Sequence, residues 1–115
     1  MIDPVVVSVR RTGPLEVALE LELDAGHPAF AGHFPGRPIL PGVVQIDWAI
    51  TLAARYLDTA QPVATDFQVK FRRTIGPDLA LELKLWLAPA RGTLSFEYRS
   101  GGDVASSGRV RLESS

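Results

Sequence analysis

The sequence predicts an α+β domain in which an antiparallel sheet of about six strands wraps around one central helix. Several segments alternate apolar and polar residues, which is typical of strands with one buried and one wet face. Residues 43–57 are instead apolar around most of a helical circumference, which is typical of a buried helix. A sheet with one apolar face and a helix without a polar face can satisfy each other if the sheet wraps around the helix.

The strands are expected in two groups, one on each side of the helix in sequence. Clusters of Gly, Pro and Asp separate the later strands and indicate tight connections. Trp86 lies on the nominally wet face of its strand, either as an isolated exposed aromatic residue or as a subunit contact. The expected strands cover residues 5–10, 15–23, 67–72, 79–87, 94–99 and 104–112.

Length, charge and composition narrow the class of protein. A chain of 115 residues makes one domain, residues 1–115. Its net charge of −1 gives no bulk attraction for nucleic acid, and its lack of cysteine excludes disulfides and thiolate metal sites. No basic segment followed by an apolar run marks a signal peptide, and the apolar runs are too short for membrane insertion. We therefore expect a cytoplasmic protein.

The segment 32–47 carries the candidate chemistry. It places His33 in a Pro/Gly loop of restricted conformation, and Asp47 in the apolar helix that follows. A histidine can act as a general base near neutral pH, and burial favours the neutral, proton-donating form of a carboxyl group. Pro41 stands where the helix would start and Gly42 follows it, so unpaired backbone N–H groups there could hold an oxyanion.

This segment resembles the FabZ/FabA group of 3-hydroxyacyl-ACP dehydratases, which have the hotdog fold. Their signature is similar to G-H-F-x-G-x-P-x-x-P-G with an acid five residues after the final glycine, and every position occurs here. Residues 38–49 are most similar to the ApeI-type dehydratases of aryl polyene pathways. Three features depart from FabZ-type chains: the acid is aspartate, as in the FabA branch, residues 74–78 replace a Pro-rich turn, and the N-terminus is short by the standards of the group.

The resemblance implies a role for each residue of the motif. His33 and Asp47 would be the catalytic pair, and the Gly42 N–H would bind the thioester oxygen. The Ile39 carbonyl would orient the His33 ring. No cofactor and no metal are implied. The remaining substrate-binding positions are Phe34 and Pro41.

The resemblance also implies partners. The basic residues Lys70, Arg72 and Arg73 would dock an acyl carrier protein bearing a phosphopantetheine-linked 3-hydroxyacyl chain, since such charges steer encounter. Alternatively, they form an ordinary solvated strand face. The chain would pair as a homodimer, or as a heterodimer with a related hotdog subunit. Such a dimer would exist by itself or as part of a larger assembly. Each tunnel would take its histidine from one chain and its acid from the other.

The predicted function is therefore 3-hydroxyacyl-ACP dehydration to a trans-2-enoyl thioester, in fatty acid or aryl polyene synthesis. The alternatives are a hotdog thioesterase and a non-catalytic acyl-binding subunit that partners a related dehydratase. Asp47 could also be a structural buried acid. His27 is expected to be structural, and a zinc site from His27, His33 and Asp47 is disfavoured because a catalytic zinc needs three well-placed ligands.

Overall fold

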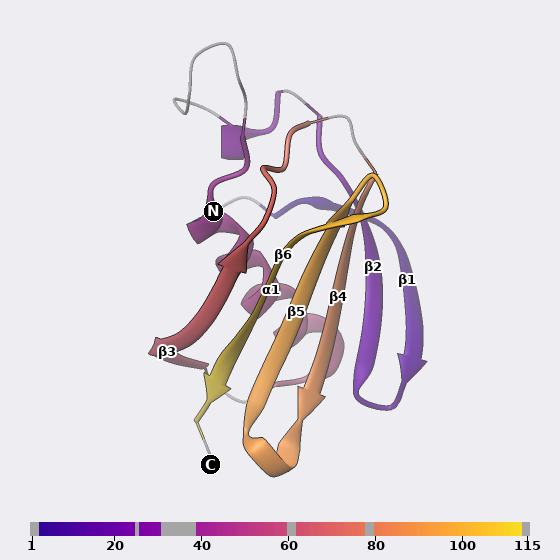
Figure 1. Cartoon of the computed structure of the whole chain (residues 1–115). Coiled ribbons are helices and arrows are strands. Elements are labelled where there is room, and N and C mark those ends of the chain that lie inside the picture. Colours follow the sequence, from indigo (N-terminus) through magenta and orange to yellow (C-terminus); the bar gives the residue numbers. More distant parts are fainter. Residues whose placement is uncertain (1–2, 25, 31–38, 60–61, 78–79, 114–115) are drawn as a thin grey trace.

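A computed structural model describes residues 3–24, 26–30, 39–59, 62–77 and 80–113. It contains one α-helix packed against a six-stranded sheet whose paired strands are all antiparallel, which confirms the predicted α+β architecture (Figure 1). The elements follow in the order β1 (Val5–Gly13), β2 (Glu16–Glu22), the 3-10 helix η1 (Pro28–Phe30), α1 (Gly42–Leu57), β3 (Pro62–Phe71), β4 (Leu81–Ala88), the 3-10 helix η2 (Pro89–Arg91), β5 (Thr93–Ser100) and β6 (Asp103–Leu112).

The strands lie in the order β1-β2-β4-β5-β6-β3, so β1 and β3 are the two edges. Strand β3 follows the helix in sequence but pairs with β6, with Phe71 opposite Ser106. It also begins earlier than the alternation predicts. Pro62 pairs with Leu112, and an irregularity separates that pair from the regular register that starts at Phe67.

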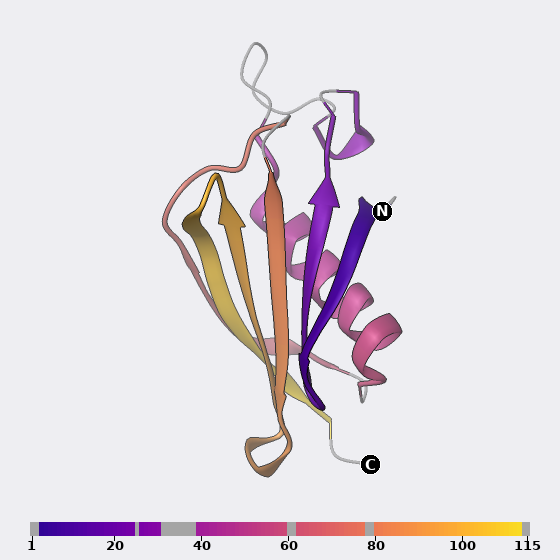
Figure 2. The same ribbon diagram turned by 90° about the vertical axis from the view of Figure 1, so that its right-hand side faces the viewer.

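The core lies between α1 and one face of the sheet, and the two views agree on this arrangement (Figures 1 and 2). The alternating residues of β2, β4 and β5 place their apolar members on this face, as predicted. Burying each such side chain contributes about 1.5–3 kcal/mol. The strand residues and helix residues of this core include Val17, Leu19, Leu21, Leu81, Leu83, Leu85, Leu94, Phe96, Trp48 and Leu52.

One side of α1 is uncovered, and here the prediction of a wholly buried helix is wrong for the single chain. Val43 is 73% exposed, and Asp47, which was expected to be buried, is also exposed. Phe67 and Phe71 on β3 are 44% and 53% exposed, although their alternation predicted a buried face. The cause is geometric, because β3 is an edge strand and α1 turns its opposite side, with Trp48, toward the sheet.

The ends of α1 are well defined. The helix begins at Gly42, one residue before the predicted start, and its C-cap Asp58 takes a left-handed conformation with φ 52° and ψ 54°. Such a residue ends a helix because the chain cannot continue in the right-handed form. Among the described residues, no helix combines the length and the hydropathy that crossing a bilayer requires.

Candidate active site

The start of α1 exposes backbone donors. Pro41 precedes the helix with φ −61° and ψ 146°, and its carbonyl accepts hydrogen bonds from the N–H groups of Val44 and Gln45, both at 3.1 Å. The N–H groups of Gly42 and Val43 have no acceptor within the part of the chain that the structure describes. Free N–H groups at a helix N-terminus favour a negatively charged oxygen, so this end of α1 is chemically suited to an oxyanion.

Gly42 lies in close contact with the ring of Phe71. A Cβ atom added to it would lie 2.6 Å from Cζ and 2.9 Å from Cε1 of Phe71, closer than real Cβ contacts allow. The Phe71 ring therefore packs directly on the glycine, and a side chain at Gly42 would have to displace it.

A pocket of about 360 Å³ opens beside the start of α1. Ile39, Pro41 and Gly42 line it, so the structure brings together three of the predicted substrate-binding residues. Arg72 and Arg73 of the predicted docking strand line the same pocket. Lys70 is separated from them and lines a different hollow on the outer side of the sheet, next to Trp86.

The structure describes only one of the two predicted catalytic residues. His33 lies outside the described residues, as does Phe34. Asp47 lies on α1 more than one turn after Gly42, and it does not line the pocket.

Burial raises the pKa of the Tyr98 hydroxyl well above its ordinary value of 10.0, and the negative charge of Asp47 adds to the shift. Tyr98 thus stays protonated and donates to the Gln45 carbonyl at 2.7 Å.

The predicted docking residues are all exposed. The N–H groups of Arg72 and Arg73 donate to the Ala105 carbonyl at 2.8 and 3.0 Å, which fixes the backbone that carries them beside β6. The Arg73 side chain forms an exposed ion pair with Asp103 at 3.5 Å. Exposed pairs of this kind contribute little to stability, so the guanidinium group can exchange this partner for another.

His27 has the contacts of a structural residue. Its Nδ1 accepts a hydrogen bond from the Ala29 N–H at 3.0 Å, so the protonated Nε2 donates to the Asp3 carbonyl at 3.2 Å. Its ring also packs edge-on against Trp48 with centroids 5.4 Å apart. Neither nitrogen is free to bind a metal, which weighs against the zinc alternative.

Sequence reasoning missed Gln45. Its side chain is only 3% exposed, and it forms hydrogen bonds at both ends. The available signal was an amide in the first turns of an otherwise apolar helix, because a buried polar side chain there needs partners.

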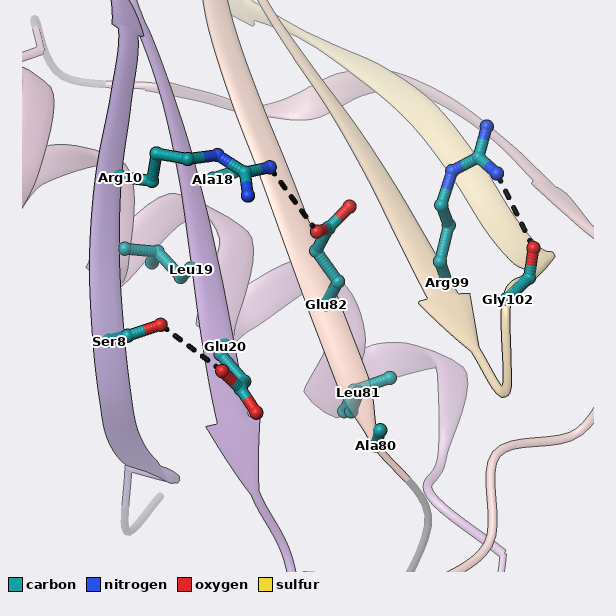
Figure 3. Close-up of a pocket in the computed structure, with 10 residues that line it drawn as sticks. All are labelled: Ser8, Arg10, Ala18, Leu19, Glu20, Ala80, Leu81, Glu82, Arg99 and Gly102. Carbon is teal, nitrogen blue, oxygen red and sulfur yellow. Dashed lines mark hydrogen bonds and ion pairs between the residues drawn. The ribbon is translucent and has the colours of Figure 1, made fainter.

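A further hollow of about 290 Å³ lies on the outer side of β1, β2 and β4 and shares no residue with the pocket at the start of α1 (Figure 3). Its polar side chains already have partners: Ser8 donates to Glu20 at 3.2 Å, and Arg10 pairs with Glu82 at 3.7 Å. Arg99 donates to the Gly102 carbonyl at 3.5 Å. We interpret it as a solvated strand surface.

Comparison with known proteins identifies the family. The model of the ApeI-like family, described as ApeI dehydratase, matches residues 9–109. The chain belongs to this ApeI-like family. A subunit of the dehydratase heterocomplex ApeI:P from Xenorhabdus doucetiae has the same fold with a TM-score of 0.86 and 30% identity, over 96% of this chain and 97% of that one. The resemblance read from residues 32–49 is therefore confirmed.

Curated relatives of this ApeI-like chain agree at the sequence level. A 3-hydroxyacyl-[acyl-carrier-protein] dehydratase FabZ of Thermomicrobium roseum is 30% identical over 98 residues, which cover 76% of this chain and 66% of the relative. A FabZ of Jannaschia sp. is 36% identical over 85 residues, 65% of this chain and 53% of the relative. The chain thus spans about half to two-thirds of the length of these relatives.

Proposed function

We propose that this chain dehydrates 3-hydroxyacyl thioesters carried by an acyl carrier protein. The observation that supports this most is the N-terminal half of α1, where free backbone N–H groups at Gly42 are followed by Asp47 in a chain of the ApeI-like family. The relatives named as 3-hydroxyacyl-ACP dehydratases support the substrate class. Fatty acid or aryl polyene synthesis is the proposed context.

The proposed reaction assigns one step to each group. His33 removes a proton from C2 of the acyl chain, and the negative charge that builds on the thioester oxygen is held by the Gly42 N–H. The electrons of the C2–H bond form the C2–C3 double bond. The C3–O bond breaks, and Asp47 gives its proton to the departing hydroxyl, which leaves as water. After the water has left, His33 returns the abstracted proton to the Asp47 carboxylate through solvent.

We propose further that a second hotdog subunit completes the site. The acid role of Asp47 requires a protonated carboxyl, and removal from water favours that form. The uncovered apolar surface of Val43, Phe67 and Phe71 lies on the side of the chain that carries Asp47 and the free edge of β3, and it gives a second subunit an area to bury. ApeI:P is a dehydratase heterocomplex, which supports a second, different subunit as the partner.

The direct test is mass spectrometry of a carrier protein loaded with aliphatic and aryl 3-hydroxyacyl chains. Dehydration by the chain, alone or with a related hotdog subunit, would remove one water from the loaded carrier. Loss of the whole acyl chain would instead support a thioesterase, and an unchanged carrier would support a non-catalytic subunit. The control is Asp47→Asn, which should leave the carrier unchanged.

Charge reversal tests the proposed docking residues. Changing Lys70, Arg72 and Arg73 to glutamate should weaken turnover of the carrier-bound substrate far more than turnover of a short free thioester. The difference should shrink as salt is added, because exposed charges are screened beyond about 8 Å at physiological ionic strength. Initial rates at several salt concentrations measure this.

A matched control makes the same change of charge elsewhere. Arg10, Lys84 and Arg91 lie away from the pocket at the start of α1, and their reversal should leave the preference for carrier-bound substrate intact. Equal losses on both substrates in the first variant would contradict a docking role.

A further inference from the structure

Gln45 joins three parts of the molecule from a buried position. Its Nε2 donates to the Leu40 carbonyl at 3.1 Å, and its Oε1 accepts from the Ser106 hydroxyl on β6 at 2.6 Å. The hydroxyl of Tyr98 on β5 donates to the Gln45 backbone carbonyl at 2.7 Å. The exposed fractions of Gln45, Ser106 and Tyr98 are 3%, 0% and 0%, so these bonds form where water does not compete.

The segment that Gln45 holds lacks one usual restraint of a helix start, a side-chain cap. Pro41 has no N–H to donate, and it makes no side-chain cap hydrogen bond to the first turn. The preceding residue is fixed on its other side, since the Leu40 N–H donates to the Ile75 carbonyl at 2.7 Å. Together with the backbone hydrogen bonds to the Pro41 carbonyl, the bond from Gln45 to the Leu40 carbonyl therefore sets the direction in which the chain enters Gly42.

The amide of Gln45 contributes to stability, because its removal would leave the Leu40 carbonyl and the buried Ser106 hydroxyl without this partner. The amide also acts on the carbonyl two residues before Gly42, the residue whose N–H binds the thioester oxygen in the proposed reaction. A donor to a transition-state oxygen must be placed accurately, since displacements of about 1 Å can lower rates about 100-fold.

We propose that Gln45 is a positioning residue that aligns the Gly42 N–H with the thioester oxygen. This inference rests on the proposed dehydratase function. Gln45 does not touch the reacting atoms; it acts through the Leu40 carbonyl and the peptide plane that follows. Ser106 and Tyr98 hold Gln45 against the sheet. The position of the Gly42 N–H is therefore fixed relative to β5 and β6 and does not depend on the helix alone.

The test replaces the amide and keeps the shape. Gln45→Met retains the length of the side chain but cannot donate to Leu40. We expect kcat on the carrier-bound substrate to fall about 10- to 100-fold with KM changed less than about twofold, because the lost alignment is felt mainly in the transition state. Gln45→Leu is a second apolar variant with the same expected effect on kcat. It takes the place of Gln45→Met if that variant folds poorly.

The matched control is Val110→Ala, which removes buried apolar volume from β6 without touching the hydrogen bonds of Gln45. It should lower the melting temperature but leave kcat near that of the wild type. Equal kcat losses in the two variants at equal melting temperature would overturn a positioning role. Wild-type kcat in a folded Gln45→Met variant would overturn it as well.

A readout without substrate separates this inference from the proposed function. The backbone amide of Gly42 should show exchange broadening in NMR spectra of Gln45→Met, because the segment before it is no longer held, and it should not in Val110→Ala. An unchanged Gly42 amide overturns the inference even when the wild type is active. A wild type that dehydrates no substrate overturns the proposed function, while the NMR comparison still decides whether Gln45 positions Gly42.

Discussion

Mixing His33→Ala chains with Asp47→Asn chains is expected to restore about a quarter of wild-type activity under random pairing of a two-fold dimer. Each variant alone should lose about 10²–10⁴-fold, the usual effect of removing an acid or base. In a mixed dimer with shared sites, one site carries both changes and the other carries neither. Turnover of the carrier-bound substrate after subunit exchange measures the recovery.

The structure makes this experiment practicable. Asp47 is exposed in the single chain, so Asp47→Asn should leave the fold intact, and circular dichroism of each variant provides the control. Native mass spectrometry establishes whether subunits have exchanged. Exchange without any recovery of activity would refute the shared site. Unfolding of Asp47→Asn would instead favour a structural role for this acid.

Gly108→Ala is expected to be among the most destabilising single-methyl additions to this chain. Gly108 lies on β6 opposite Val69, and a Cβ there would approach the backbone oxygen of Gln68 to 2.7 Å and the Phe96 ring to 2.7 Å. The backbone oxygen cannot move without disturbing the pairing of β3 and β6. Overpacking of this kind costs about 1–3 kcal/mol of the free energy of unfolding, which thermal or urea unfolding can measure.

Gly13→Ala provides the matched control, because the nearest atoms to its added Cβ belong to Glu16 and lie 3.8 Å away, an ordinary contact. It should change the free energy of unfolding by much less. Equal stability of Gly108→Ala and the wild type would show that β3 and β6 are less tightly apposed than described.

The fold was largely predictable because its main signals are local. Alternation identified five of the six strands, a further short strand was expected at residues 5–10, and the apolar run identified α1 to within one residue at its start. The order of the strands was not predictable in this way. Alternation assigns a residue to a face of the sheet but does not name the neighbouring strand, so the pairing of β3 with β6 carries no local signature. The irregular start of β3 at Pro62 likewise breaks the alternation.

Exposure near the candidate site was predicted less well, and the reason is physical. Apolar residues such as Val43 and Phe71 show that a surface avoids water, but not whether the same chain covers it. The expectation that Asp47 is buried treated the whole circumference of α1 as covered by one chain. The motif did identify the residues around the pocket, namely Ile39, Pro41 and Gly42. Gln45 escaped notice because its partner Ser106 is distant in sequence.

The pairing of β3 with β6 also has a consequence for folding. Strands β4 and β5 lie between β3 and β6 in sequence. After α1 ends, β3 therefore has no partner strand until β6 is in place in the β4–β5–β6 meander. Contacts between segments so far apart close late, because the loop-closure entropy must be overcome first. The pocket wall carrying Phe71 and Arg72 therefore forms after the β4–β5–β6 meander. Slow refolding would appear as late recovery of substrate binding, after this meander has regained its protection from hydrogen exchange.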